Sequence, residues 1–269
     1  MKNLEQYRGC LIGGAAGDAL GYAVEFPGTD AAVKKYGKSG SKNCKLHNGI
    51  APVSSVTQMT LFTANGLLLG TTRGMTRGIM GSYPAYIAAC YKDWLQTQSA
   101  AYPLRPRSPY SWLVNEPELF ARRDPGNTCI SAIINGADGT IDAPMNQSKG
   151  CGGMVRVAPI GLYLGGRRYE SDKIDMIGAE TAALTHGHEL GYIPAAAFVH
   201  MLIAAVNHSG ASSSTGAVTG SIMGTYLGYS SIPDKYIENL ELKNVILELA
   251  DDLYHDCIWN KAWLCAKGG

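Results

Sequence analysis

The sequence predicts an all-α protein, and three observations support this prediction. Apolar residues recur at helical spacing along most of the 269 residues. Few alternating β-branched runs of strand length occur between them. The hydrophobic fraction of 46% against a charged fraction of 17% is typical of a globular chain with a large core. No shift in composition marks a boundary, so we expect a single domain spanning residues 1–269.

Each predicted helix has its own apolar stripe. The stripes of the first three helices are Leu4, Tyr7, Leu11 and Ile12; then Met59, Phe62 and Leu67, after Thr57; and then Ile87, Cys90, Tyr91 and Trp94. The same spacing predicts later helices over 172–184, 192–206, 214–227 and 243–258. Polar, Pro-containing stretches at 101–117 and 138–150 are predicted to be surface loops. The 33 glycines cluster at predicted helix ends and in pairs, which suits close helix packing.

Composition excludes several classes of function. The chain has 23 Lys and Arg against 22 Asp and Glu, so no overall positive field favours nucleic acid. The 7 cysteines include no C-x-x-C pair, which indicates reduced thiols. The apolar runs are broken well short of the ~20 residues that span a bilayer, and Met1 to Arg8 lack a signal-peptide core. We therefore expect a cytoplasmic protein with no membrane or nucleic-acid partner.

The first candidate site residue is Asp18, within the glycine-rich stretch from Gly9 to Gly21. Small residues at Gly13, Ala16 and Gly17 allow another backbone to approach this predicted helix closely. Asp18 is interpreted first as a structural group that hydrogen-bonds a neighbouring loop.

Two glycine-bearing loops precede predicted helices, at Gly126-Asn127-Thr128 and from Ser148 to Arg156. Backbone N–H groups and the positive end of a helix dipole can hold an anion such as a pyrophosphate there. Simple helix capping is the alternative. Cys129 and Cys151 lie in these segments, but neither is expected to be a nucleophile, because no general base is implied nearby.

The segment Thr185-His186-Gly187-His188 lies between two predicted helices. A His-x-His pair can hold a metal, but without Cys or carboxylate partners it is more often a capping or hydrogen-bonding element.

Six segments of the sequence, taken together in chain order, resemble those of a known family. They are Gly-Asp-Ala-Leu-Gly from Gly17, Thr57-Gln58-Met59-Thr60, Gly126-Asn127-Thr128, the run from Gly150 to Arg156, Leu184 to His188, and the polar segment from Asn207 to Ala217. As an ordered set they resemble the ADP-ribosylglycohydrolase family, from about Tyr7 to about Leu253. The resemblance implies an all-α orthogonal bundle. It also implies a cleft with two Mg²⁺ ions, in which ADP-ribose on arginine or a related acceptor is hydrolysed at the anomeric carbon.

The metal ligands that this resemblance implies are missing. An Asp-Asp pair is expected just before Thr57, where the chain has Ser55-Val56, and an Asp-x-Asp is expected where it has Ala211 and Ser213. Two divalent ions ~4 Å apart repel by about 16 kcal/mol at an effective dielectric of 20. Carboxylates offset that repulsion, whereas hydroxyls do not. We therefore expect no metal and no cofactor, with six degenerate positions: Ser54, Ser55, Val56, Ala211, Ser213 and Ser214.

Other positions of the implied cleft are retained. By resemblance, Glu25 matches an acidic residue near the scissile end of the substrate, and the loop that cradles the diphosphate and distal ribose is Gly150, Cys151, Gly152, Gly153 and Met154. Asn127 and His186 match positions that line the cleft. If the protein is active, Glu25 and Asp18 are the candidate catalytic residues.

Three functions remain open at this point. The first is a pseudoenzyme that binds ADP-ribose, a related nucleotide or an ADP-ribosylated protein, with little or no hydrolysis. The second is a metal-independent hydrolase or lyase acting on an N- or O-glycosidic bond of an ADP-ribose-like substrate, with Glu25, Asp18 or His186 as general acid or base. The third is a structural or interaction protein that reuses the scaffold. The natural ligand is not specified by the sequence.

Overall fold

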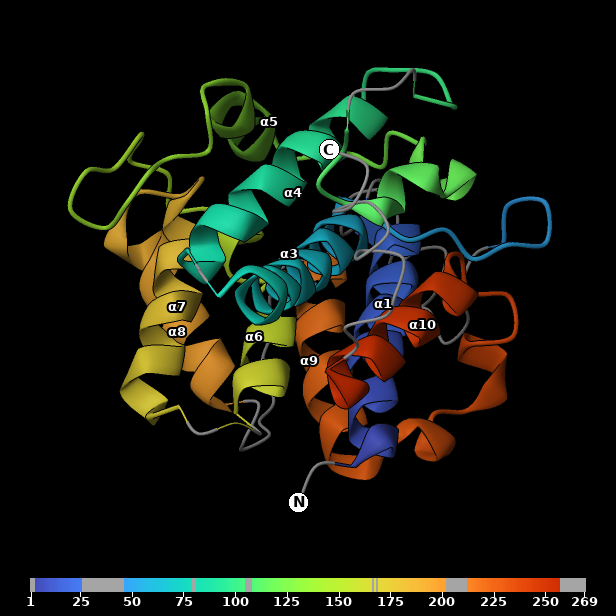
Figure 1. Cartoon of the computed structure of the whole chain (residues 1–269). Helices are drawn as coiled ribbons and strands as arrows, with labels where there is room; N and C mark the ends of the chain where they lie inside the picture. The colour runs from blue at the N-terminus through green and yellow to red at the C-terminus, as the bar shows by residue number, and fades with distance from the viewer. Residues whose placement is uncertain are drawn as a thin grey trace.

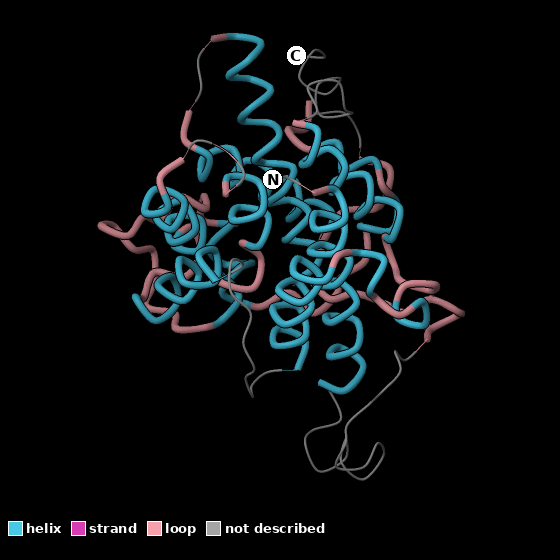
Figure 2. The backbone as a smooth tube through the Cα atoms, turned by 90° about the horizontal axis from the view of Figure 1, so that it is seen from below, coloured by secondary structure: helices cyan, strands magenta, loops and turns pink. Residues whose placement is uncertain are grey.

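The computed structural model describes residues 3–25, 46–78, 81–104, 108–165, 167, 169–201 and 212–256, without the side chains of residues 23–25, 201 and 212–215. Helices joined by loops make up these residues, as Figures 1 and 2 show. The described part contains isolated β-bridges but no β-strand, so the predicted all-α class is confirmed. The α-helices are α1 (Leu4–Glu25), α3 (Ser55–Arg77), α4 (Tyr83–Thr97), α5 (Asn127–Ile134), α6 (Ala158–Leu164), α7 (Ser171–Ala183), α8 (Glu189–Met201), α9 (Ser212–Leu227) and α10 (Lys243–His255).

Helix α3 forms the centre of the molecule (Figure 1). It is buried on nearly all sides from Ser55 to Thr72, as expected for a helix surrounded by others. Its start is capped by Ser54, whose hydroxyl accepts a hydrogen bond from the N–H of Val56, and its end by Gly78 in the left-handed conformation. These two caps set the ends of the helix around which the rest packs.

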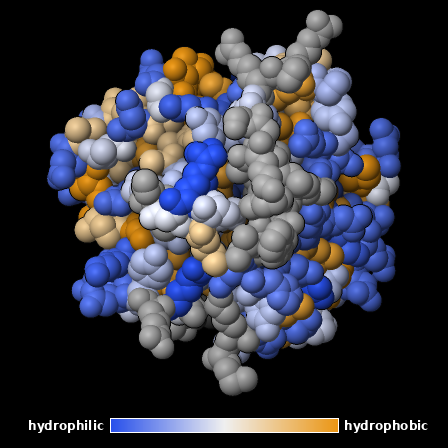
Figure 3. Space-filling view, in the orientation of Figure 1, coloured by the Kyte–Doolittle hydropathy of each residue, from blue (hydrophilic) through white to orange (hydrophobic). Residues whose placement is uncertain are grey.

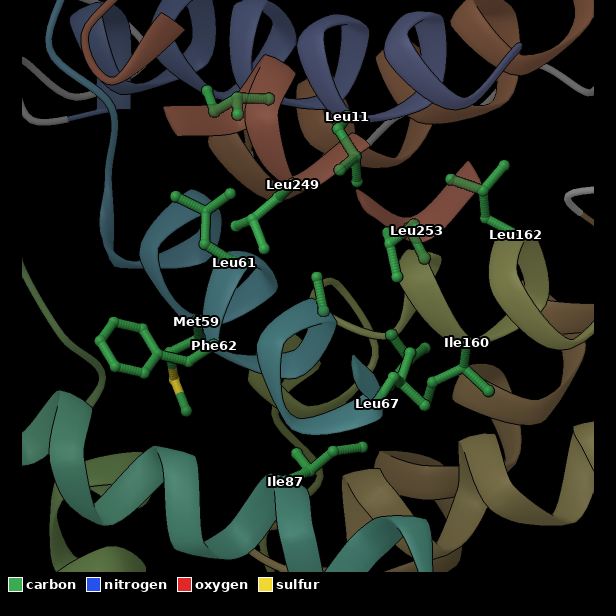
Figure 4. Close-up of a cluster of buried hydrophobic side chains, with 14 of the residues drawn as sticks. Leu11, Met59, Leu61, Phe62, Leu67, Ile87, Ile160, Leu162, Leu249 and Leu253 are labelled. Atoms are coloured by element: carbon green, nitrogen blue, oxygen red, sulfur yellow. The ribbon is translucent and has the colours of Figure 1, made fainter. Parts of the chain in front are cut away.

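The core joins α3 to helices on several sides. Figure 4 shows its side chains converging from α1, α3, α4, α6 and α10; among them are Leu11, Phe62, Leu67, Ile87, Ile160, Leu249 and Leu253. Each of these is at most 4% exposed. The stripes predicted for the first three helices therefore face one shared core.

Helices α1 and α9 run antiparallel in unusually close contact. Gly9, Gly13 and Gly17 of α1 face glycines of α9 one for one, and a Cβ added at Gly17 would lie 1.9 Å from the carbonyl oxygen of Gly216. The predicted close approach at Gly13 and Gly17 is confirmed. Only glycine allows two helix backbones to come this near.

Where both are described, the helix ends lie within a few residues of the predicted limits. Residues 202–206 and 257–258 of two predicted helices lie outside the described residues. One predicted loop is wrong in part. Residues 101–117 were expected at the surface, whereas Trp112 and Leu113 are fully buried in a 3-10 helix (Trp112–Asn115). The N–H of Ser111 donates to the buried carboxylate of Asp93 over 2.7 Å, which holds this segment against α4. The second predicted loop, 138–150, is largely exposed.

Much of the described surface on the face of Figure 1 is hydrophilic, with separate apolar patches (Figure 3). Within the described ranges, none of the helices combines the length and the apolar character needed to cross a bilayer.

Candidate functional site

A pocket of about 380 Å³ opens between the end of α1 and the starts of α3 and α5. A 3-10 turn, η3 (Cys151–Gly153), closes another side. The residues that line the pocket are Tyr22, Ser54, Ser55, Val56, Met59, Asp124, Gly126, Thr128, Cys129, Gly150, Cys151, Gly152, Val155, Arg156 and His186. The predicted residues Ser54, Ser55, Val56, Gly150, Cys151, Gly152 and His186 thus meet at one pocket.

Hydroxyl groups, not carboxylates, form the wall at the start of α3. The hydroxyl of Ser54 donates to Asp18 over 2.6 Å and accepts from the N–H of Val56 over 3.1 Å. The hydroxyl of Ser55 donates to the backbone carbonyl of Asp124 over 3.3 Å. Val56 contributes only an alkyl side chain to the lining.

Asp18 lies behind this wall, fully buried, and does not line the pocket. Its carboxylate accepts hydrogen bonds from the hydroxyls of Ser54 and Thr57, each over 2.6 Å, and from their N–H groups over 2.9 and 3.3 Å. Burial raises the pKa of Asp18 to about 6, while these hydrogen bonds act in the opposite direction. This is the geometry of a structural group that holds the start of α3 against α1.

The start of α5 presents backbone N–H groups to the pocket. Its N-cap residue is Gly126, and no side chain caps it. The first N–H groups of a helix have no intrahelical acceptor, and Thr128 and Cys129, which line the pocket, are among these first residues. The side chain of Asn127 is exposed and is not part of the lining. The helix start therefore offers donors and a positive dipole end to a ligand.

The glycine-rich loop packs tightly on the same pocket. A Cβ at Gly152 would lie 3.1 Å from the ring of His186 and 3.3 Å from the sulfur of Cys129. Gly150 and Gly152 thus keep backbone, not side chain, at the surface of the pocket. Gly153 and Met154 lie outside the lining: Gly153 packs against Ala182, and Met154 packs against the core.

Arg156 is a site residue that sequence reasoning left out of the candidate set. It is fully buried, and its guanidinium donates to the hydroxyl of Thr185 over 2.7 Å and lies 3.5 Å from the sulfur of Cys129. The guanidinium also lies 4.5 Å from the ring centre of Tyr91. None of its hydrogen-bond partners in the described part of the chain is a carboxylate, and its Nε has no partner there. Arg156 therefore brings to the pocket lining a positive charge whose hydrogen-bond partners, among the described residues, are all neutral.

His186 is neutral in this setting. Burial, and secondarily the charge of Arg156, lower its pKa to about 3. Its Nδ1 is hydrogen-bonded to the hydroxyl of Thr185 over 2.8 Å, whereas His188 accepts the N–H of Leu190 over 3.0 Å at the start of α8. Both histidines thus make hydrogen bonds within this segment, as the simpler interpretation predicts.

Asp124 and Tyr22 are two further lining residues that the sequence did not single out. The phenol of Tyr22 donates to Oδ2 of Asp124. Burial and this hydrogen bond raise the pKa of Tyr22, so the phenol keeps its proton. The only signal in the sequence was position: Asp124 comes just before the loop at Gly126, and Tyr22 lies one helical turn before Glu25.

Several predicted residues fall outside what the structure describes. Ala211 is not described, and neither are the side chains of Glu25, Ser213 and Ser214. The backbone of Glu25 ends α1, and that of Ser213 and Ser214 lies in the first turn of α9.

The described residues do not fit a pair of Mg²⁺ ions. Mg²⁺ prefers carboxylate and other oxygen ligands in an octahedral shell. At the start of α3 the structure offers hydroxyls that are engaged in hydrogen bonds, together with the alkyl group of Val56. In the described ranges, no group of three or more His, Cys, Asp or Glu side chains is arranged to hold a metal.

Comparison with known proteins agrees with this architecture. A family model described as ADP-ribosylglycohydrolase matches residues 1–205 and 198–262. A solved structure titled "ADP-ribosylglycohydrolase-related protein complex" superimposes with a TM-score of 0.60 at 19% identity, over 95% of this chain and 99% of that one, which shows a shared fold. No curated protein matches the chain. The family match extends over nearly the whole sequence, and the chain therefore belongs to the ADP-ribosylglycohydrolase family.

Proposed function

We propose that this family member binds ADP-ribose, a related nucleotide or the ADP-ribosyl group of a modified protein, with little or no hydrolysis. The observation that carries the proposal is a pocket that combines amide donors, a buried guanidinium and hydroxyl groups, at a place where the family resemblance calls for acidic metal ligands. This combination suits a phosphorylated ligand better than it suits divalent cations.

Electrostatics support binding of an anion. The uncapped start of α5 directs N–H groups and the positive end of a helix dipole toward the pocket. Beneath it lies Arg156, whose charge meets no carboxylate among the described residues. Since a buried charge without a counter-charge is costly, a phosphate above it would relieve that cost.

The same electrostatics oppose a metal-dependent reaction. The ~16 kcal/mol repulsion between two nearby dications at an effective dielectric of 20 requires carboxylates between them. Ser55 and Val56 supply none, and the positive charge of Arg156 adds to the repulsion. No step of the proposed function passes through a metal.

The two alternatives fit the described geometry less well. Metal-independent hydrolysis needs a general acid or base in contact with the ligand. Asp18 lies behind the pocket wall with its oxygens hydrogen-bonded. His186 lines the pocket, but burial lowers its pKa to about 3, which makes it a weak base. The side chain of Glu25, the third candidate, lies outside the described residues. A purely structural role would suit a cleft filled by side chains, whereas about 380 Å³ remains open.

Titration calorimetry tests the proposal directly. ADP-ribose is titrated into the protein in buffer with EDTA and again with Mg²⁺, and product release is followed in the same samples. We expect saturable binding in both buffers, with the same dissociation constant and no released product. Absence of heat at millimolar ligand in both buffers would contradict binding, and robust turnover would contradict the pseudoenzyme assignment.

A further inference from the structure

We propose that Cys129 and Cys151 are an oxidisable thiol pair, which a peroxide converts into a disulfide across the lining of the pocket. The proposal concerns a modification of the protein itself and goes beyond the proposed function, so its test needs no nucleotide. Both residues are reduced cysteines in the structure. Disulfides that form transiently in otherwise reduced proteins usually have a catalytic or redox-sensing role.

The two cysteines line the same pocket but differ in exposure. Cys151 is exposed at the start of η3, whereas Cys129, in the first turn of α5, is only 5% exposed. A dissolved oxidant therefore reaches Cys151 first, and Cys129 is the protected partner that resolves the oxidised sulfur. An accessible thiol next to a second, resolving thiol is typical of redox-sensing sites.

The backbone brings the two cysteines close together. A Cβ at Gly152 would lie 3.3 Å from the sulfur of Cys129, and Cys151 directly precedes Gly152. Cα atoms of α5 and η3 lie within 8 Å of one another, while a disulfide joins Cα atoms about 4.4–6.8 Å apart. Gly150 and Gly152 flank Cys151, and their backbone freedom lets the turn adjust to this geometry.

Arg156 supplies the positive charge that the reaction needs. The sequence implies no general base near either thiol, but the guanidinium of Arg156 lies 3.5 Å from the sulfur of Cys129. Arg156 is fully buried, and its hydrogen-bond partners in the described part of the chain include no carboxylate. A neighbouring cation or a helix N-terminus stabilises negative charge on sulfur, and the thiolate is the attacking group in disulfide formation. Cys129 has both, since no side chain caps the start of α5.

The reaction balances in two steps. Hydrogen peroxide transfers an OH group to the thiolate of Cys151, so that an S–O bond forms, the O–O bond breaks and hydroxide leaves. The thiolate of Cys129 then attacks the sulfur of this sulfenic acid; an S–S bond forms, the S–O bond breaks and a second hydroxide leaves. The two protons that the thiols gave up convert both hydroxides to water. The thiol pair thus loses two electrons, and the peroxide gains them.

Peptide mapping tests the pair directly. The reduced full-length protein is treated with hydrogen peroxide, and the remaining thiols are alkylated. Trypsin then releases Cys129 in residues 124–149 and Cys151 in residues 150–156, each with a single cysteine, so a linked product identifies the disulfide. The same treatment in urea, where the fold is lost, controls for chance pairing among the 7 cysteines.

We expect these two peptides to be linked in the folded protein, and dithiothreitol to reverse the link, with a mixture of pairings in urea. Cys129→Ser should abolish the link and leave on Cys151 a sulfenic acid that dimedone labels. Arg156→Met should slow formation of the link about three- to tenfold at saturating peroxide, because the attacking sulfur loses the cation beside it. Arg156→Lys, which keeps a positive charge, should slow it less.

The matched control is Cys90→Ser, which removes a buried thiol away from the pocket and should leave the link unchanged. Thermal unfolding checks that each variant is folded, and the wild-type result depends on no variant. Absence of the linked product at every peroxide concentration that leaves the protein folded would overturn the proposal. An equal yield of that product in urea, or oxidation of Cys10 or Cys90 before Cys151, would overturn it as well.

Discussion

Asp18 on α1 and Thr57 on α3 are joined by a 2.6 Å hydrogen bond between a buried carboxylate and a hydroxyl. The same carboxylate accepts from the cap residue Ser54, so one acidic side chain fixes the first turn of α3. That turn is also the pocket wall where the family resemblance implies acidic metal ligands and the chain has Ser55 and Val56. A structural contact therefore maintains the shape of a wall that presents hydroxyl and alkyl groups.

The first prediction concerns the pH dependence that Asp18 imposes on stability. Its pKa is about 6 in the folded protein and close to 3.9 in an unfolded chain. Between these values the folded state retains a proton that the unfolded state has released, so the free energy of unfolding falls as the pH rises through this window. The loss amounts to about 3 kcal/mol. The excess stability of the wild type over Asp18→Asn should therefore shrink between pH 4 and pH 7, as measured by urea unfolding.

Asp93 provides an internal check on that experiment. Burial also raises the pKa of Asp93 to about 6. Asp93 therefore adds the same pH-dependent change to the free energy of unfolding of the wild type and of Asp18→Asn. The difference between the two proteins therefore isolates Asp18. A difference that is constant with pH would contradict the prediction.

The second prediction concerns the contact between α1 and α9. In Gly17→Ala the new Cβ meets the backbone oxygen of Gly216 at 1.9 Å, and backbone cannot move aside without separating the helices. We expect a loss of about 2–4 kcal/mol in the free energy of unfolding. The matched control is Gly14→Ala on the same helix, where the close atom at 2.4 Å is the hydroxyl of Ser221, a side chain that can rotate. Equal destabilisation of both variants would contradict this account of the contact.

The sequence predicts the helices well because the signal for them is local. Met59, Phe62 and Leu67 lie on one side of a helix with 3.6 residues per turn, and such a pattern depends on no distant partner. The limits of the helices follow from equally local features, such as the cap at Ser54. The predicted surface position of Trp112 was wrong because its burial depends on packing of its 3-10 helix against α3 and α4, which the local pattern around Trp112 does not encode.

The site is less predictable, for the same physical reason. Arg156 is notable only because distant residues such as Cys129 and Thr185 surround it without a carboxylate. The contact of Asp124 with Tyr22 joins residues 102 positions apart. A glycine-bearing motif in the sequence indicates where backbone N–H donors lie. It does not show which buried charges have no oppositely charged side chain beside them.

The third prediction concerns thiol reactivity. Cys151 is exposed in the pocket lining, whereas Cys10 and Cys90 are fully buried, and burial raises the pKa of both. Iodoacetamide should therefore modify Cys151 well before these two in the folded protein, as peptide mass spectrometry will show. Saturating ADP-ribose should slow the reaction at Cys151, because the proposed ligand covers it. Unchanged labelling at saturation would argue against occupancy of this pocket.

The fourth prediction separates binding from stability at Arg156. The variant Arg156→Met replaces the guanidinium by an apolar chain of similar length and so removes the buried charge. Because that charge has no carboxylate partner in the described chain, we expect the free energy of unfolding to change by less than about 2 kcal/mol. Affinity for ADP-ribose should nevertheless fall at least about tenfold, since the counter-charge for the diphosphate is lost. Calorimetry and urea unfolding of Arg156→Met measure the two effects, and a large loss of stability with unchanged affinity would assign Arg156 a structural role.

The fifth prediction restores the missing acids. A variant with Ser55→Asp, Val56→Asp, Ala211→Asp and Ser213→Asp regains the carboxylates that the family resemblance implies. Without metal, these like charges should repel one another and lower the melting temperature below that of the wild type. Mg²⁺ should raise the melting temperature of this variant and not that of the wild type, because ligands that bind only the folded state stabilise it.

The corresponding variant with Asn at the same four positions separates charge from size. Because Asn is neutral, this variant should show no lowering of the melting temperature by charge repulsion without metal. Mg²⁺ should not raise its melting temperature either. If the wild type releases no arginine from ADP-ribosylarginine and the restored carboxylates confer Mg²⁺-dependent release, charge at these four positions is what separates the two proteins. An equal Mg²⁺ response in the wild type would contradict the electrostatic argument, because neutral hydroxyl and alkyl groups at Ser55 and Val56 would then be sufficient to hold the ions.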